Sequence, residues 1–230
     1  IPIENSLAGR VADIHYLIPK YKLQIHAEHF QKVTHNLLGI KGSKLEDIKT
    51  VRSHSQAIGQ CSKVILKNKL KPIVSADTAG SAKFIAEKKD KSESAIASDL
   101  AANIYNLEIL LSSVEDEFEN VTRFLIMGKD SQHPDFNNGK YITSCIFKLK
   151  STPAALYKAL GGFATNGVNL SKLESFSVKN TFDQVNFYID IQGHIEDPSL
   201  KKALEELGFH TEKLDILGVY EANKFRFKNK

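Results

Sequence analysis

The stretch Asn120-Val121-Thr122-Arg123-Phe124-Leu125-Ile126-Met127 turns from an acidic segment, Glu115–Glu119, into a β-branched and aromatic run. This pattern predicts a buried strand. Side chains alternate along a strand, so Thr122 and Phe124 face one side and Arg123 faces the other. A threonine at a strand edge is most often only a strand former, but a hydroxyl beside an aromatic ring can also donate to a ligand. The alternation gives no argument for Arg123 as a ligand of the same molecule, and its role is left open.

The composition of the chain excludes several classes of protein. It has 230 residues, of which 42% are hydrophobic and 25% charged, as in an ordinary globular protein with one large or two modest domains. The net charge of +4 is spread along the chain, which predicts no nucleic-acid partner. Cys61 and Cys145 lie far apart without metal-type spacing, so we expect a reduced, cytoplasmic protein. No apolar run reaches the ~20 residues of a membrane helix, and we expect no membrane partner.

Strand-like segments alternate with helical patterns from Ile1 to Met127, which predicts an α/β domain with a parallel or mixed sheet. Pro19 is expected to end the first helix, and 33–38 is expected to pair with 23–30. The predicted strands are 1–3, 23–30, 33–38, 50–52, 72–75, 95–97, 107–111 and 122–127. The predicted helices are 11–18, a short one opened by the Ser43–Glu46 capping box, and helices starting at Ser53, Asp77-Thr78 and Ser98.

Polar residues follow several of these strands. Asn5 and Ser6 end the first one, where a side chain either binds a ligand or caps the following helix. Ser53 is expected to open a helix, and Gln60 lies two helical turns later on the same face. Gln60 could therefore reach a ligand held near that helix start, whereas on an ordinary helix it would face solvent.

Beyond a polar, turn-rich linker at 130–140 the pattern starts again. It predicts a first domain over 1–129, a second over 141–222 and a basic tail over 223–230. The second domain has the order β-α-β-β-α-β, which is ferredoxin-like. Its predicted elements are strand 141–149, a helix from Pro153 to Asn166-Gly167, strand 168–176, a turn at Lys179-Asn180, strand 184–192, helix 198–207 and strand 215–220.

The reactive groups in the sequence favour a reaction that relies on uncharged polar side chains. The sequence has no Gly-x-Gly-x-x-Gly, phosphate loop or paired cysteines, and we predict no cofactor. His26, His29 and His35 suggest a metal site, but 26 and 29 point to opposite faces of a strand and no carboxylate cluster accompanies them. We therefore predict no metal.

Four motifs in this order resemble prephenate dehydratases: Pro2–Ser6, Ser53–Ala57 with Gln60-Cys61, Asp77–Gly80 and Thr122–Phe124. The resemblance implies a two-lobed catalytic domain like a periplasmic binding protein, followed by an ACT regulatory domain. It also implies that relatives carry residues before the position of Ile1, so we expect the sequence to be a fragment. In this family the threonine of Thr-Arg-Phe is essential, so the resemblance implies that Thr122 is the catalytic residue. Asn5, Ser6, Ser53, Gln60 and Phe124 would bind the substrate.

The implied reaction converts prephenate to phenylpyruvate. Carbon dioxide and the ring hydroxyl leave, and the departing hydroxide needs a proton. The sequence leaves two alternatives open. Arogenate dehydratase uses the same residues on an aminated substrate, and a non-catalytic amino-acid sensor would keep the two-domain order without the chemistry.

The second domain departs from its family at two positions. Ala154 stands in place of the glycine of a Gly-Ala-Leu turn, and Phe176 replaces the arginine of Glu-Ser-Arg-Pro. Backbone and amide groups remain for a ligand, so the resemblance implies a homodimer or tetramer that binds phenylalanine. The alternative is a domain that only dimerises. The residues implied in phenylalanine binding are Ala155, Leu156, Asn169, Glu174 and Ser175.

Overall fold

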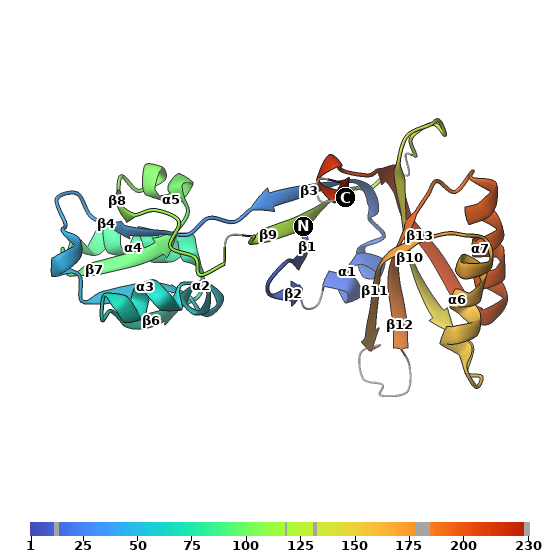
Figure 1. Cartoon of the computed structure of the whole chain (residues 1–230), viewed down its shortest axis with the longest axis horizontal. Helices are drawn as coiled ribbons and strands as arrows, with labels where there is room; N and C mark the ends of the chain where they lie inside the picture. The colour runs from blue at the N-terminus through green and yellow to red at the C-terminus, as the bar shows by residue number, and fades with distance from the viewer. Residues whose placement is uncertain (12–13, 118, 131–132, 178–184, 228–230) are drawn as a thin grey trace. The chain divides into compact units, whose positions relative to one another are not determined.

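The computed structural model describes residues 1–11, 14–117, 119–130, 133–177 and 185–227 (Figure 1). The chain divides into two compact units. Unit 1 comprises Ile1–Asn5, Arg10–Gln31 and Arg123–Lys230, and unit 2 comprises Ser6–Gly9 and Lys32–Thr122. Strand β9 (Val121–Gly128) crosses from one unit to the other, because the boundary falls between Thr122 and Arg123.

Unit 2 is built on a five-stranded sheet of order β6-β5-β7-β4-β8. Strand β5 is parallel to β6 and β7, whereas β4 is antiparallel to β7 and β8, so the predicted mixed α/β sheet is confirmed. The strands are β4 (Asn36–Gly39), β5 (Thr50–His54), β6 (Lys71–Ser75), β7 (Glu93–Ala97) and β8 (Glu108–Leu111). The helices are η1 (Leu45–Asp47), α2 (Ser55–Gln60), α3 (Ser62–Lys67), α4 (Thr78–Lys88) and α5 (Asp99–Ile104).

The helix starts of unit 2 agree with the sequence in two places and differ in two. Asp77 caps α4 by accepting from the Gly80 amide at 2.6 Å, and Ser98 caps α5 by accepting from the Ala101 amide at 3.1 Å, as predicted. The capping box at Ser43 is wrong, because η1 begins after Lys44 without a side-chain cap. The helix predicted to start at Ser53 begins at Ser55 instead, because Ser53 is still part of β5.

The second half of unit 1 has the predicted β-α-β-β-α-β order, and its sheet order β11-β12-β10-β13 is ferredoxin-like. Helices α6 and α7 cover one face of this sheet (Figure 1). Strand β13 starts earlier than predicted, and the predicted turn at Lys179-Asn180 lies outside the described residues. The elements are β10 (Tyr141–Leu149), α6 (Ala155–Thr165), β11 (Leu170–Ser177), β12 (Val185–Gln192), α7 (Pro198–His210), β13 (Thr211–Glu221) and η2 (Lys224–Phe227).

The other face of the same sheet is covered by the first elements of the chain together with β9. Ile3, Ile25 and Leu125 pack there against Ile146 and Leu217 in one hydrophobic core. A Cβ atom built on Gly218 of β13 would lie 2.1 Å from the carbonyl oxygen of Ile25, so only glycine fits this close approach. The covering elements are β1 (Pro2–Asn5), β2 (Gly9–Arg10), α1 (Ile14–Tyr21) and β3 (Gln24–Lys32).

Three sequence predictions about these elements are wrong. Strand β3 belongs to a sheet of order β2-β1-β9-β3, whereas its predicted partner 33–38 supplies β4 of the other sheet. For the same reason β9 does not complete the five-stranded sheet. Pro19 lies inside α1, which continues to Tyr21, because Ile18 and His15 are buried by packing and this burial offsets the lost hydrogen bond.

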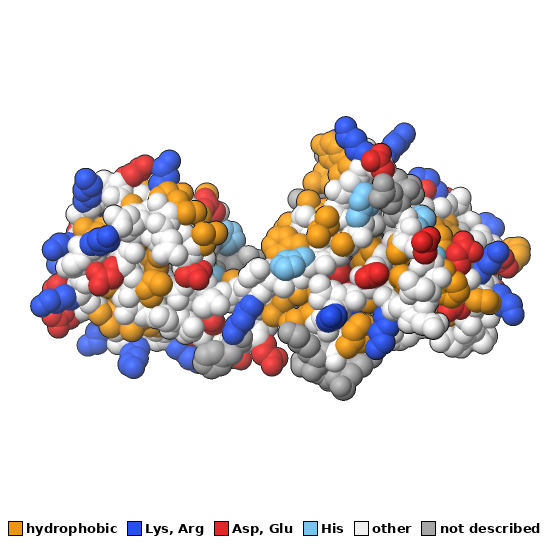
Figure 2. All heavy atoms as spheres, turned by 90° about the horizontal axis from the view of Figure 1, so that it is seen from above, with side chains coloured by type: hydrophobic (Ala, Val, Ile, Leu, Met, Phe, Trp, Pro, Cys, Tyr) orange, Lys and Arg blue, Asp and Glu red, His pale blue; other side chains and the backbone are white. Residues whose placement is uncertain are grey.

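The surface carries no concentrated charge on the face that Figure 2 shows, where basic and acidic side chains are interspersed. Among the described residues, no helix is long and apolar enough to cross a membrane.

Ala154 provides a test of the turn before α6. Its backbone is left-handed, with φ 58°, a conformation that costs an L-residue about 1–2 kcal/mol but not glycine. We expect Ala154→Gly to raise the free energy of unfolding of unit 1 by about 0.5–1 kcal/mol in urea titrations, since the freer unfolded chain offsets part of the relief. The matched control is Ala164→Gly within α6, which should lower stability by about 1 kcal/mol. A loss of stability in both variants would contradict the strain at Ala154.

Candidate active site

Arg123 is the centre of a buried ion cluster in unit 1. Its side chain is 2% exposed, although it carries a permanent charge. The guanidinium donates to Glu28 of β3 at 2.8 Å, to Glu4 of β1 at 2.9 Å and to Asp190 of β12 at 2.5 Å. It also donates to the Tyr220 hydroxyl of β13 at 3.0 Å. One side chain of β9 is thus hydrogen-bonded to four other strands.

The carboxylate of Asp190 is fully buried and has partners on both oxygens. Oδ2 accepts from Arg123, and Oδ1 accepts from the hydroxyls of Ser144 at 2.5 Å and Tyr188 at 2.7 Å. Burial alone would raise the pKa of this carboxyl, but Arg123 and the two hydroxyls outweigh burial and hold the pKa below its ordinary value. Asp190 therefore remains charged opposite Arg123.

The cluster continues in both directions as an alternating series of charges, which we call the ion chain. Glu28 accepts from Arg226 at 2.7 Å, and Glu4 accepts from Lys172 at 2.7 Å. Burial favours the neutral form of Glu4, yet Lys172 and Arg123 together lower the pKa of this carboxyl. The series in order is Arg226, Glu28, Arg123, Glu4, Lys172 and Glu174.

The predicted catalytic strand has the expected alternation. Thr122 and Phe124 are half-buried, whereas Arg123 and Leu125 are buried. Asn5 is half-buried at the end of β1, next to Glu4 of the ion chain. Asn5 and Phe124 belong to unit 1, and Thr122 is the last residue of unit 2.

Ser6 and Gln60 contact the residues just before Thr122 within unit 2. The Ser6 hydroxyl donates to the Glu119 carbonyl at 2.6 Å and accepts from the Val121 amide at 2.9 Å. The Gln60 side-chain oxygen accepts from Asn120 Nδ2 at 3.0 Å and lies 3.0 Å from Nε2 of His35. The structure thus brings two predicted binding residues to the segment that leads into β9.

Ser53 is fully buried at the end of β5, and its hydroxyl donates to the Ile96 carbonyl at 2.7 Å. That hydroxyl could therefore meet a substrate only as an acceptor. The neighbouring His54 caps α2 through Nδ1, which accepts from the Gln56 amide at 3.3 Å.

The residues predicted to bind phenylalanine all lie in unit 1. Asn169 lies just before β11 and precedes Glu174 by five positions, about 16 Å of extended chain. Ala155 and Leu156 open α6, and the Ser175 carbonyl accepts from Arg10 at 3.1 Å.

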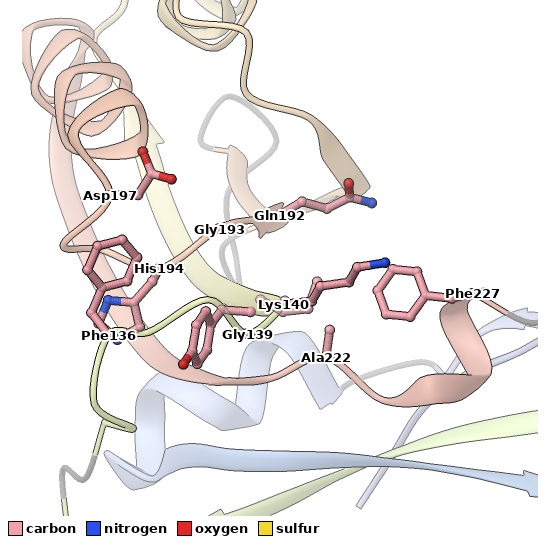
Figure 3. Close-up of a pocket in the computed structure, with 11 residues that line it drawn as sticks. Phe136, Gly139, Lys140, Gln192, Gly193, His194, Asp197, Ala222 and Phe227 are labelled. Carbon is pink, nitrogen blue, oxygen red and sulfur yellow. The ribbon is translucent and has the colours of Figure 1, made fainter. Parts of the chain in front are cut away.

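A separate hollow of about 360 Å³ lies beside β10, β12 and β13 (Figure 3). Phe136 stacks on His194 with ring centres 5.2 Å apart, and the Lys140 ammonium lies 4.0 Å from the ring centre of Phe227. None of the residues predicted to bind substrate or phenylalanine lines this hollow. Within the described part of the chain, no group of three potential metal ligands occurs.

Sequence reasoning missed the ion chain. The available signal was Asp190 between Ile189 and Ile191 on an apolar strand, because a buried carboxylate requires a cation nearby. That signal calls for a partner without saying which of the 31 lysines and arginines supplies it.

Comparison with known proteins gives a consistent family. The family model described as prephenate dehydratase matches residues 1–132. A Komagataeibacter europaeus protein named bifunctional N-acyl-homoserine lactone acylase/prephenate dehydratase is 46% identical over 98% of this chain and 80% of its own length. The Arabidopsis thaliana arogenate dehydratase/prephenate dehydratase 1 is 36% identical over 98% of this chain, which spans only 61% of that relative. The solved prephenate dehydratase of Arthrobacter aurescens in complex with L-Phe is 30% identical, with a TM-score of 0.85 over 96% of this chain and 74% of its own.

The ion cluster predicts a large effect of Arg123→Met. The substitution keeps an unbranched apolar chain but leaves Asp190 and Glu28 buried without this cation. We expect the free energy of unfolding of unit 1 to fall by about 3–5 kcal/mol in urea titrations. The control is Lys148→Met, which removes an ion pair with Glu212 of 2.7 Å at the surface and should cost about 0–1 kcal/mol. Equal losses in the two variants would show that the cluster does not stabilise unit 1.

The burial of His15 leads us to expect that the stability of unit 1 depends on pH. The side chain is 3% exposed, packs edge-on against Tyr188 at 4.9 Å, and Nε2 has no hydrogen-bond partner among the described residues. Burial, aided by Lys172, lowers the pKa of His15 from 6.5 to about 4. Between these values the unfolded state binds the proton more tightly, so stability falls as pH decreases from 6.5 towards 4.

We expect His15→Leu to make the melting temperature less dependent on pH over that interval, because leucine keeps the packing without titrating. The control is His29→Leu, which removes an exposed imidazole from β3 and should leave the slope unchanged. An unchanged slope in His15→Leu would mean that His15 does not fold in its neutral form.

Proposed function

This chain belongs to the prephenate dehydratase family of lyases, and we propose that Thr122 donates the proton in the decarboxylating dehydration of prephenate to phenylpyruvate. The observation that carries this role is the anchoring of the Thr122-Arg123-Phe124 strand. The guanidinium of Arg123 is held by the ion cluster, which fixes the strand that carries Thr122 and Phe124 on either side of it.

The reaction balances with one proton donor. The bond to the departing carboxylate breaks, its electron pair enters the ring, and the carbon–oxygen bond on the opposite side of the ring breaks. The leaving hydroxide takes the proton of Thr122 and becomes water, and the threonine oxygen regains a proton from solvent. An alkoxide and hydroxide have similar basicity, so this transfer is nearly balanced. Positioned proton donation of this kind is worth roughly 10²–10⁴-fold.

The proposed binding residues suit the polar groups of prephenate. Ser53 would accept from the ring hydroxyl, because its own proton goes to the Ile96 carbonyl. Gln60 would donate through its amide nitrogen to a carboxylate, because its oxygen already faces Asn120 and His35. Asn5 and Ser6 would complete the polar contacts, and Phe124 would cover the ring.

The substrate and the regulation are part of the same proposal. Arogenate is the alternative substrate, and the Arabidopsis relative carries both dehydratase activities in its name. We assign residues 141–222 to an ACT domain that binds phenylalanine in a homodimer or tetramer, supported by the βαββαβ topology and by the solved relative in complex with L-Phe. Both cysteines are free and buried, which agrees with a cytoplasmic enzyme.

N-acyl-homoserine lactone acylase is a second candidate activity, favoured by the 46% identity to a relative that carries this name. Neither cysteine is suited to be its nucleophile, because burial raises the pKa of Cys61 to about 12 and also raises the pKa of Cys145. Release of free homoserine lactone from an N-acyl-homoserine lactone, followed by chromatography, would establish this activity.

Thr122→Val tests the proton donor, because valine keeps the shape of the side chain and removes the hydroxyl. We expect kcat for prephenate to fall by on the order of 10²-fold or more with little change in KM, measured by the absorbance of phenylpyruvate. Thr122→Ser is the matched control and should retain most of the activity. Near-normal turnover in Thr122→Val, with an unchanged circular dichroism spectrum, would exclude Thr122 as the donor.

A further inference from the structure

Lys172 of β11 is shared between two carboxylates, one next to a predicted substrate-binding residue and one in the predicted phenylalanine region. Its side chain is 8% exposed, and its ammonium lies 2.7 Å from Glu4 and 3.4 Å from Glu174. Glu4 precedes Asn5 on β1, whereas Glu174 belongs to the region assigned to phenylalanine. A single ammonium therefore joins the two.

The ion chain leads onward from Lys172 to the catalytic strand. Glu4 holds Lys172 with one oxygen and Arg123 with the other, at 2.7 and 2.9 Å. Arg123 directly follows Thr122 in the sequence. In addition, Lys172 and Asp190 are register partners in the β11–β12 pair. Lys172 therefore lies opposite a residue that is itself a direct partner of Arg123.

An amino acid would interfere with this arrangement through its own charges. Its ammonium would compete with Lys172 for Glu174, and its carboxylate would compete with Glu174 for Lys172. The contact between Lys172 and Glu174 is the longer of the two that Lys172 makes, so it is the one that exchanges partners more readily. Any shift of Lys172 changes the charge around Glu4, and Glu4 is a direct partner of Arg123.

We propose that Lys172 is a positioning residue through which an amino acid bound at Glu174-Ser175 alters the placement of Asn5 and Thr122. This inference rests on the proposed function, because it takes phenylalanine as the effector and Thr122 as the proton donor. Lys172 does not contact the reacting atoms. It acts through its contacts with both Glu4 and Glu174. Its contribution is to make β1 respond to β11.

The experiment uses the full chain and compares wild type, Lys172→Met and Lys148→Met. Lys148 is the matched control, since it lies in the same sheet, pairs with Glu212 at 2.7 Å and is not a member of the ion chain. Titration calorimetry measures phenylalanine binding, and hydrogen exchange measures the protection of amides in β1 and β9 with and without phenylalanine. Steady-state kinetics then measure kcat and KM under the same conditions.

In wild type and Lys148→Met we expect phenylalanine to change exchange in β1 and β9 and to lower kcat by about tenfold. In Lys172→Met we expect phenylalanine to bind with a Kd within about tenfold of wild type, without altering exchange in these strands or kcat. Lys172→Arg should restore the response, because it returns a cation to the same place. A purely structural lysine would change stability without separating binding from response.

Two results would overturn the inference, and they are distinguishable. If Lys172→Met binds phenylalanine and transmits it as Lys148→Met does, Lys172 has no positioning role. If wild type binds no phenylalanine, the effector part of the proposed function fails and the inference fails with it. Should Lys172→Met not fold, Lys172→Gln replaces it, and a retained response in that variant has the same meaning.

Discussion

The guanidinium of Arg123 and the carboxylate of Asp190 meet in a part of unit 1 where water reaches neither, with side-chain exposures of 2% and 0%. A buried charge costs several kcal/mol of desolvation free energy unless a partner of opposite charge and additional hydrogen bonds compensate for it, about as much as an ion pair can return. Arg123 satisfies this requirement only when β1, β3, β12 and β13 all present their polar groups to it. The pair therefore selects one arrangement of these strands, while the surrounding apolar residues of the core supply most of the stabilisation.

This constraint supports the role that we propose for Thr122 on the same strand. Arg123 is turned into the core and fixed by four partners, so it holds the adjacent residues of β9 in place. A hydroxyl held in this way loses little further freedom when a substrate arrives, which is the condition under which a weak acid becomes an effective donor. The ion chain connects β9 to β11, because Glu28 and Glu4 each form ion pairs with two cations.

Local sequence patterns were sufficient to predict the elements that begin or end at a recognisable cap or breaker residue. The β-α-β-β-α-β order was predictable because each apolar run ends at its own breaker, such as Asn166-Gly167 after α6, and Asp77 and Ser98 signalled helix starts. The alternation along β9 placed Thr122 and Arg123 on opposite faces correctly. The residues of the candidate site come from the family motifs, and their roles stay a prediction, whereas the structure shows that Ser6 and Gln60 contact the residues just before Thr122.

Partners far apart in the chain could not be predicted in this way. Strand β3 pairs with β9, about a hundred positions later. The hydrophobic periodicity of each strand does not identify its pairing partner. The same is true of Arg123, whose partners Glu28, Asp190 and Tyr220 come from three separate segments. Ser53 was placed on a helix because serine is a common cap, whereas the hydrogen bond to Ile96 keeps it in the sheet.

The most direct test of this account is a double-mutant cycle between Arg123 and Asp190, read as the free energy of unfolding in urea. The cycle compares wild type with Arg123→Met, Asp190→Asn and the double variant, and asparagine keeps the hydrogen-bonding shape that faces Ser144 and Tyr188. Our account predicts that the double variant is more stable than the sum of the single losses implies, by at least about 1 kcal/mol, because removing the second charge relieves the cost of the first. Losses that add within about 0.5 kcal/mol would show that the two groups are independent and that this ion pair does not hold β9 in place.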